Sequence, residues 1–183
     1  MRNVFRSALI LCVGLSSLAF VYPIDNASEE ENETITWYTW DEAIELQKEN
    51  PKKLFIDVYT DWCGWCKKMD RSTFKDKSVA RVMNKYFYAV KFNAEQKESI
   101  EYKDHTLKYL PKAGRRGVHE LAYALLDGRM GYPSFVYLDE KGDRITISPG
   151  YKDAKAIQKE LAYVGGEHYK NQKFDEFSAS YGK

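Results

Sequence analysis

A nearly unbroken run of β-favouring residues, KLFIDVYT at residues 53–60, restricts the possible folds of this chain more than any other feature. Such a run is typical of a central strand that is buried on both faces of a mostly parallel sheet. It leads directly into DWCGWCKKM, which has helical character from its first cysteine onward. The sequence therefore predicts a buried strand joined to a helix, with two cysteines at the junction.

Strand-like and helix-like patterns alternate along the rest of the chain. A short strand from residue 35 precedes a helix that is capped by Thr39 and ends at Pro51. The other expected elements are a helical stretch at 66–87, a strand at 88–95, a helix at 119–128, a hairpin at 133–150 and a helix at 153–166. This order predicts an α/β sandwich in which helices flank a central mixed β-sheet.

The predicted domain covers residues 34–166, and an insert at residues 96–117 interrupts its alternating pattern. Within the insert, SIEYKDHTLKYLP alternates around a polar centre, which predicts a β-hairpin, and KAGRRG reads as a loop. Residues 20–33 are polar and acidic, so we expect a disordered leader. Residues 167–183 form a C-terminal tail with a weak helical signal.

Residues 1–19 have the pattern of a secretory signal peptide. Arg2 and Arg6 precede a short apolar run that ends in small residues, and the run is shorter than the roughly 20 apolar residues of a membrane-spanning helix. Cleavage is expected after Ala19, with Ala27 as a weaker second position. We therefore expect an exported protein, periplasmic in a Gram-negative bacterium and otherwise secreted, without membrane insertion after cleavage. An uncleaved amino-terminal membrane anchor is the alternative.

Length and charge exclude some classes of partner. The chain has 183 residues, enough for one domain with a sizeable core. Its 28 basic and 27 acidic residues leave a formal charge of +1, which gives no reason to expect a nucleic acid or an anionic membrane as partner. Removal of a signal peptide that contains Cys12 leaves Cys63 and Cys66, so no separate disulfide framework is expected.

The placement of these two cysteines favours redox chemistry over a structural metal site. A structural zinc site needs four ligands, usually in two pairs. The chain has no second CxxC, and we interpret its three separate histidines as ordinary surface or capping residues: His105, His119 and His168. No bound metal is expected.

Cys63 is expected at the amino terminus of a helix, where unpaired N–H groups and the helix dipole stabilise negative charge. This position lowers the pKa of the Cys63 thiol and makes it a nucleophile. Cys66, one turn further along, is expected to be more buried and to attack a mixed disulfide. A redox dithiol is the favoured interpretation, and a metal-transfer pair or an inert pair are the alternatives.

Three stretches together resemble the thioredoxin superfamily. LFIDVYTDWCGWCKKM resembles the family's strand, active-site loop and helix start, and AVKFNAE resembles the next strand. GYPSFVYLDEKGD resembles the loop in which a cis proline, here Pro133, faces the dithiol. The resemblance covers about residues 37–164 and implies a thioredoxin-like sandwich with an inserted hairpin or loop before the cis-proline segment.

Asp57 lies six residues before Cys63, where thioredoxins keep a buried carboxylate. Aspartate is disfavoured inside a buried strand, and an unpaired buried carboxylate is costly. We interpret Asp57 as a general base with a pKa raised by burial, which takes the proton from Cys66 directly or through water. An exposed Asp57 at a strand edge is the alternative. Lys91 falls where the family places a lysine partner of that carboxylate, although a plain exposed lysine would also fit.

The resemblance also implies where a substrate binds. In the family, the residue before the cis proline offers backbone hydrogen bonds to an extended substrate chain, and Tyr132 holds that place here. Gly131 would let the partner chain approach. Trp62 and Trp65 would flank the sulfurs with flat apolar surface, and core packing is the alternative for both.

Two features depart from the family pattern. The dipeptide between the cysteines is Gly64–Trp65, which is neither the Gly-Pro of general reductases nor a histidine-containing pair of strong oxidants and isomerases. Without that histidine, a reducing or intermediate potential is the more natural expectation. The insert carries Arg115 and Arg116 near the expected proline loop. It either shapes partner choice or forms a solvated loop.

Together these observations predict an exported thiol–disulfide oxidoreductase that exchanges with protein or peptide disulfides through Cys63 and Cys66. It is expected to act more as a reductase than as an oxidase and to need no cofactor. A membrane-bound thiol reductase or oxidase is expected to recycle the dithiol. The alternatives are a Cu(I) metallochaperone, since soft thiolates favour that ion, and a non-catalytic peptide-binding module.

Overall fold

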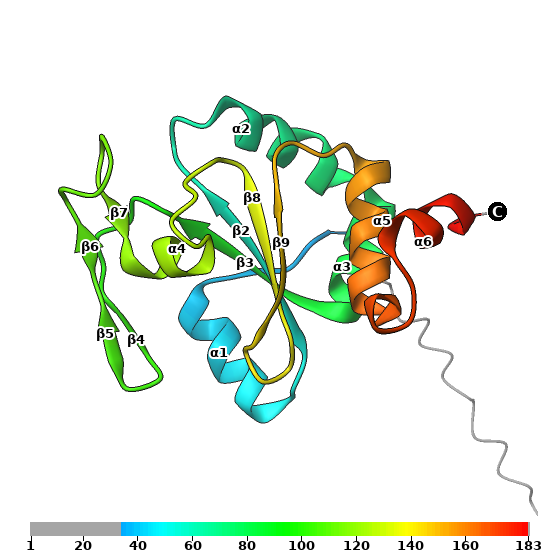
Figure 1. Cartoon of the computed structure of the whole chain (residues 1–183), viewed down its shortest axis with the longest axis horizontal. Helices are drawn as coiled ribbons and strands as arrows, with labels where there is room; N and C mark the ends of the chain where they lie inside the picture. The colour runs from blue at the N-terminus through cyan, green and yellow to red at the C-terminus, as the bar shows by residue number, and fades with distance from the viewer. Residues whose placement is uncertain (1–33, 183) are drawn as a thin grey trace, which may run out of the picture.

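The computed structural model describes residues 34–182, so the expected signal peptide and leader lie outside the described residues. A five-stranded sheet in the order β1-β3-β2-β8-β9 forms the centre of the molecule (Figure 1). Its strands are β1 (Trp37–Tyr38), β2 (Lys53–Tyr59), β3 (Phe87–Asn93), β8 (Ser134–Leu138) and β9 (Arg144–Pro149). The first three run parallel, whereas β8 is antiparallel to both of its neighbours, so the predicted mixed sheet is confirmed.

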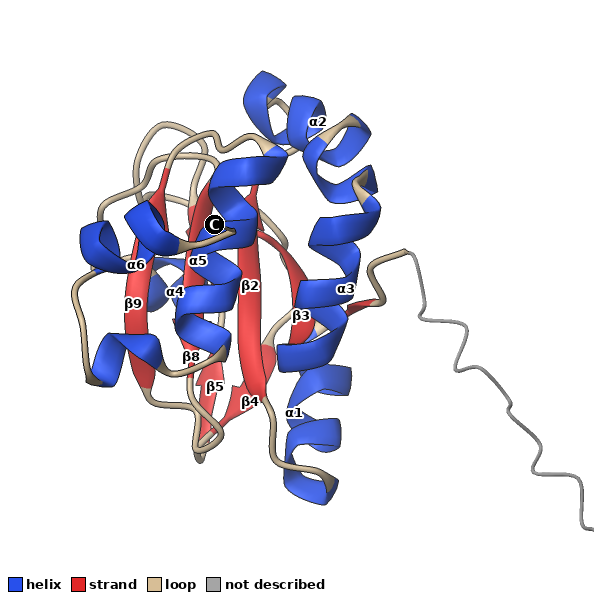
Figure 2. Ribbon diagram, turned by 90° about the vertical axis from the view of Figure 1, so that its right-hand side faces the viewer, coloured by secondary structure: helices blue, strands red, loops and turns tan. Residues whose placement is uncertain are grey.

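Helices cover both faces of this sheet. One face carries α1 (Trp40–Glu49) and α4 (Glu120–Leu125). The other carries α2 (Gly64–Arg71), η1 (Thr73–Lys75), α3 (Lys77–Tyr86) and α5 (Ala154–Gly165). Figure 2 shows α3 and α5 side by side against the sheet. The predicted sandwich with helices on both sides is therefore the observed architecture.

The position of β2 between two hydrophobic cores explains why its sequence is apolar almost throughout. Leu54 and Ile56 point into the core under α1 and α4, whereas Phe55 points into the core under α2, α3 and α5. Alternate residues of a strand face opposite sides, so a central strand between two cores needs apolar side chains on both. Asp57 interrupts this pattern on the α2 side and is buried there.

The helical stretch expected at residues 66–87 is divided. Helix α2 ends at Arg71, a short 3-10 turn follows, and α3 begins after Asp76. The Asp76 carboxylate accepts hydrogen bonds from the N–H groups of Ser78, at 2.8 Å, and Val79, at 3.3 Å. An Asp that caps two free N–H groups starts a new helix, and this local signal outweighs the continuous helical character of the stretch.

The insert is folded onto the domain through short strands and also carries an exposed loop. It contains β4 (Ile100–Tyr102) and β5 (His105–Leu107), which form the expected hairpin, and β6 (Tyr109–Leu110), which pairs with β7 (Val118–His119) directly after the insert. Ile100 and Val118 are buried in the core beneath α4. Tyr102 packs edge-on against Trp40 of α1 with ring centroids 5.0 Å apart. The expected hairpin is therefore confirmed, and the KAGRRG stretch is a mostly exposed loop, as the sequence predicted.

The C-terminal tail is partly helical. It contains η2 (His168–Lys170) and α6 (Phe174–Ser180), and Phe177 packs against Tyr163 of α5 with ring centroids 5.4 Å apart. The part of the chain seen in the structure, residues 34–182, contains no helix of the length and apolarity that a membrane crossing requires.

Candidate active site

Cys63 and Cys66 lie at the junction of β2 and α2 and form a disulfide. The N–H of Cys63 donates to the Thr60 carbonyl at 3.0 Å, which closes the turn after β2. Cys63 is the N-cap residue of α2, and its Sγ accepts a hydrogen bond from the N–H of Cys66 at 3.1 Å. The expected helix-terminal position of Cys63 is thus observed, and a Cys63 thiolate formed on reduction would meet the same N–H.

The expected contrast in burial between the two cysteines is absent in this oxidised form. Cys63 is 4% exposed and Cys66 is 2% exposed. The disulfide bond draws the Cys63 sulfur against the first turn of α2, so both residues are covered. Access to this sulfur therefore depends on the residues around it.

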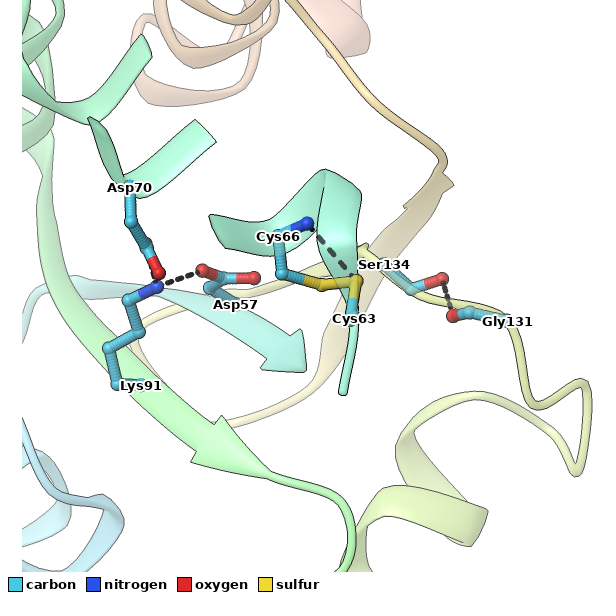
Figure 3. Close-up of a disulfide and its surroundings, with 7 residues drawn as sticks. All are labelled: Asp57, Cys63, Cys66, Asp70, Lys91, Gly131 and Ser134. Atoms are coloured by element: carbon cyan, nitrogen blue, oxygen red, sulfur yellow. Dashed lines mark hydrogen bonds and ion pairs between the residues drawn. A yellow bond between two sulfur atoms is a disulfide. The ribbon is translucent and has the colours of Figure 1, made fainter. Parts of the chain in front are cut away.

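Asp57 lies beneath the disulfide in the middle of β2 and is 1% exposed. The parallel register of β2 and β3 pairs it with Lys91, whose Nζ lies 2.7 Å from Asp57 Oδ2. The other carboxylate oxygen, Oδ1, has no hydrogen-bond partner among residues 34–182. In Figure 3 the Asp57 carboxyl group lies between the Lys91 amine and Cys66. The exposed strand-edge alternative for Asp57 is wrong.

Burial raises the pKa of Asp57 to about 6, although the positive charge of Lys91 opposes this change. Desolvation disfavours the charged form of a buried carboxyl group, and here it outweighs the attraction to the lysine. Near neutral pH, Asp57 is therefore a carboxylate that can accept a proton. The same pair raises the pKa of Lys91, which stays positively charged.

Asp70 is a third member of this charged group that the sequence analysis missed. It lies on α2, and its carboxylate forms a second ion pair with the Lys91 amine, next to that of Asp57 (Figure 3). Its side chain is 41% exposed, so it connects the buried pair to the surface. Asp70 follows Cys66 by four residues, and residues at this spacing share one face of a helix. This four-residue spacing was the sequence signal that could have identified Asp70 as part of the site.

The two tryptophans beside the cysteines are exposed, at 52% for Trp62 and 56% for Trp65. Core packing is therefore the wrong interpretation for both. Trp62 Nε1 donates to Glu95 Oε1 at 2.9 Å, and its ring meets that of Tyr132 edge-on at 5.8 Å. Trp65 lies 5.1 Å from the ring of Tyr151. Aromatic surface thus flanks the disulfide on both sides.

The loop before β8 lies opposite the disulfide, next to Cys63 (Figure 3). The Tyr132–Pro133 peptide bond is cis, as the resemblance implied. Ser134 Oγ donates to the Gly131 carbonyl at 2.7 Å, and the N–H of Gly150 donates to the Pro133 carbonyl at 2.8 Å. The N–H and C=O of Tyr132 form no hydrogen bond with any residue of 34–182.

Two glycines leave space beside this loop and the disulfide. A Cβ added at Gly64 or at Gly131 would meet nothing within 4 Å. The structure thus brings every sequence-predicted site residue to one end of the sheet.

The histidines take no part in the site. His119 caps α4, since its Nδ1 accepts from the N–H of Leu121 at 3.1 Å, and its Nε2 lies 3.0 Å from the Glu98 carbonyl. It is fully buried rather than at the surface, and burial lowers its pKa. His105 is exposed and His168 is half-buried. Residues 34–182 contain no group of three or more His, Cys, Asp or Glu that is arranged to hold a metal ion.

A disulfide at the start of a helix, reached from the central strand of such a mixed sheet and facing a cis-proline loop, defines a thioredoxin-fold protein of the thiol–disulfide oxidoreductase class. The chain belongs to the family described as Thioredox_DsbH, protein of unknown function DUF255, whose sequence model matches residues 26–151.

Solved structures agree with this fold. A thioredoxin-fold protein from Helicobacter pylori superposes with a TM-score of 0.53 and 15% identity over 82% of this chain and 88% of its own. A thioredoxin from Thermus thermophilus superposes with a TM-score of 0.51 and 17% identity over 76% and 99%. At these identities the likeness shows the fold alone.

Curated relatives are much longer than the segment they share with this chain. Uncharacterized protein B0495.5 of Caenorhabditis elegans is 31% identical over 74 residues, which are 40% of this chain and 10% of that protein. Spermatogenesis-associated protein 20 of Mus musculus is 28% identical over 68 residues, which are 37% and 9%. The chain therefore matches only about a tenth of their length.

Replacing Asp57 by Asn should make stability less dependent on pH. The Asp57 pKa of about 6 exceeds its ordinary value of 3.8, so the folded state binds more protons between about pH 4 and pH 6. The free energy of unfolding of the wild type therefore falls as the pH rises through this window. At pH 8, Asp57→Asn should be more stable by up to about 3 kcal/mol. Urea unfolding of the oxidised proteins at several pH values measures this.

In that experiment, Asp143→Asn is the control, because Asp143 is exposed and far from the disulfide. A difference between wild type and Asp57→Asn that stays constant from pH 4 to pH 8 would contradict the raised pKa.

Replacing Asp70 by Asn should lower the pKa of Asp57. The negative charge of Asp70 raises the pKa of Asp57. Without that charge, Lys91 would interact with the Asp57 carboxylate only and would stabilise its charged form. Titration of the Asp57 carboxyl carbon by NMR, with Asp143→Asn as the control, measures this shift. An unchanged or higher pKa in Asp70→Asn would show that Asp70 does not act through its charge.

Proposed function

We propose that this chain is an exported oxidoreductase that reduces disulfide bonds of proteins or peptides. The observation that carries the proposal is the disulfide at the start of α2 with the buried Asp57 carboxyl group behind it. The chain in this structure is in the oxidised form, which is the product state of such a reductase. The proposed reaction begins from the dithiol.

In the first step, the Cys63 thiolate attacks one sulfur of the substrate disulfide. An S–S bond forms between Cys63 and the substrate, and the second substrate sulfur leaves as a thiolate that takes a proton. In the second step, Cys66 loses its proton and its thiolate attacks Cys63 Sγ. This forms the observed disulfide and releases the first substrate sulfur as a thiol. Two electrons pass from the dithiol to the substrate.

Asp57 is the base that we assign to the second step. Its Oδ1 has no partner among the described residues, and its carboxyl group lies next to Cys66 (Figure 3). A pKa of about 6 leaves most of the carboxyl group ionised at neutral pH and able to take the Cys66 proton. Lys91 holds the other oxygen, so the carboxylate has a fixed orientation.

Two features support the reducing direction. The Cys66 N–H is the only hydrogen-bond donor that residues 34–182 offer to Cys63 Sγ, and no histidine lies between the cysteines. The buried negative charge of Asp57 disfavours a second negative charge on Cys66. Both features limit stabilisation of the thiolate, and a less stabilised dithiol gives up its electrons more readily.

The loop before β8 supports a peptide chain as substrate. The unpaired N–H and C=O of Tyr132 are free to form backbone hydrogen bonds with an extended segment. Gly131 and Gly64 leave open space beside it, and Trp62 and Trp65 supply apolar surface on either side. A substrate disulfide would approach the Cys63 sulfur between these groups.

Export and recycling complete the proposal. The charged start and short apolar run of residues 1–19 support export, to the periplasm or out of the cell. A reductase outside the cytosol needs a source of electrons, and we assign this role to a membrane-bound thiol reductase.

Replacing the two cysteines separately should have different effects. Cys63→Ser should abolish reduction of insulin disulfides, because the attacking sulfur is lost. Cys66→Ser should accumulate a Cys63–substrate mixed disulfide, because the resolving thiol is lost. Insulin precipitation measures turnover, and non-reducing mass spectrometry detects the adduct. The double variant Cys63→Ser/Cys66→Ser is the control for the adduct. Wild-type turnover by Cys63→Ser would refute the mechanism.

The reduction potential of the Cys63–Cys66 pair distinguishes a reductase from an oxidase. We expect a value nearer to about −270 mV than to about −120 mV, the two ends of the range for such proteins. Equilibration with defined ratios of reduced and oxidised glutathione, followed by alkylation of free thiols, measures it. A value at the oxidising end would reverse the proposed direction of electron flow.

A further inference from the structure

The insert places a fixed cation beside the candidate active site. Two backbone hydrogen bonds hold the base of the loop that carries this cation: the N–H of His119 donates to the Ala94 carbonyl at 2.7 Å, and the N–H of Glu120 to the Lys108 carbonyl at 2.8 Å. The N–H of Lys108 donates in return to Glu120 Oε2 at 2.6 Å. The loop between β6 and β7 therefore starts and ends on anchored residues.

The end of this loop is equally constrained. The hydroxyl of Tyr109 donates to the carbonyl of Arg116. Gly117 has a φ of +77°, and a Cβ there would lie 2.2 Å from the Tyr109 hydroxyl oxygen and 2.9 Å from the Leu110 carbonyl oxygen. Glycine alone fits such a position. The backbone of Arg116 is thus fixed through its own carbonyl and through the residue that follows it.

The Arg116 side chain contacts Trp62, which is part of the candidate active site. Its guanidinium carbon lies 5.6 Å from the centroid of the Trp62 ring, within the range of a cation–π interaction. Trp62 directly precedes Cys63 and is held by Glu95 and Tyr132. Figure 1 shows the β6–β7 hairpin beside α4, with its loop extending toward the end of the sheet where α2 lies.

A second cation lies at the other tryptophan. Lys68 Nζ is 5.0 Å from the Trp65 ring and 4.8 Å from the Tyr151 ring. Neither Lys68 nor Arg116 forms an ion pair with a carboxylate of residues 34–182, whereas Lys53 and Lys91 each contact two. Each exposed tryptophan beside the disulfide therefore carries a cation without a carboxylate partner.

We propose that Arg116 selects substrate segments that carry an aspartate or glutamate next to the disulfide cysteine. This inference rests on the proposed function and specifies its substrate class. A peptide on the Trp62 side of Cys63 would bring its carboxylate to the planar guanidinium, which binds carboxylates through two parallel hydrogen bonds. The indole excludes water from one side of this contact, so the attraction is stronger than between fully exposed charges.

The test uses the reduced mature chain and three peptides with one internal disulfide. The peptides are identical except that the residues next to the cysteines are Glu, Gln or Lys. The second-order rate constant of single-turnover reduction is measured by tryptophan fluorescence at low and high salt. At low salt, the Glu peptide should react about tenfold faster than the Lys peptide, and salt should reduce this ratio.

Arg116→Glu should invert the ratio so that the Lys peptide reacts faster. Arg115→Glu is the matched control, because Arg115 is exposed in the same loop and its replacement changes the net charge equally. Arg115→Glu should keep the preference for the Glu peptide. Equal loss of preference in both variants, or equal rates for all peptides with the wild type, would overturn the inference and leave the proposed function intact. Failure to reduce any of the peptides would overturn both.

Discussion

The buried ion pair between Asp57 and Lys91 is the interaction on which the site depends. The parallel register of β2 and β3 places the two residues side by side, so the pair is a direct product of the sheet. Burial of a carboxyl group against the core is costly, and the lysine offsets part of that cost. What remains is a carboxyl group whose pKa, at about 6, is close to physiological pH and whose free oxygen lies next to the disulfide. Lys91 does not fully offset the effect of burial on Asp57, so its pKa stays high enough for the carboxylate to act as the proposed base.

The two faces of the sheet have different roles. The face beneath α2, α3 and α5 carries the disulfide helix and the charged group of Asp57, Lys91 and Asp70. The face beneath α1 and α4 carries the insert, whose Ile100 shares the core of α4 with Val118 of β7. The two layers meet where Arg116 lies over Trp62. On the proposed function, the residue that selects the substrate and the charged group behind the disulfide thus come from opposite faces of one sheet.

Much of this arrangement could be predicted from the sequence, because its strongest signals are local. The apolar run of β2, the two cysteines at the start of a helix and the Gly131–Pro133 loop each identify their own element, and their order gives the sheet. Contacts between distant elements were harder to predict. Asp70 of α2 contacts Lys91 of the distant strand β3, so only its spacing from Cys66 indicated a role. The insert has short strands with weak patterns, and its burial depends on Ile100 and Val118 meeting α4, which no local pattern specifies.

The separation between the layers has an evolutionary consequence. The loop that carries Arg116 lies between two anchored strands and makes no contact with Asp57 or its partners among the contacts described above. Its length and charge can therefore diverge between related proteins without breaking the contacts of Asp57 with Lys91 or of Lys91 with Asp70. On the proposed function, mutation of this surface loop would change which substrates are selected while the charged group behind the disulfide is inherited unchanged.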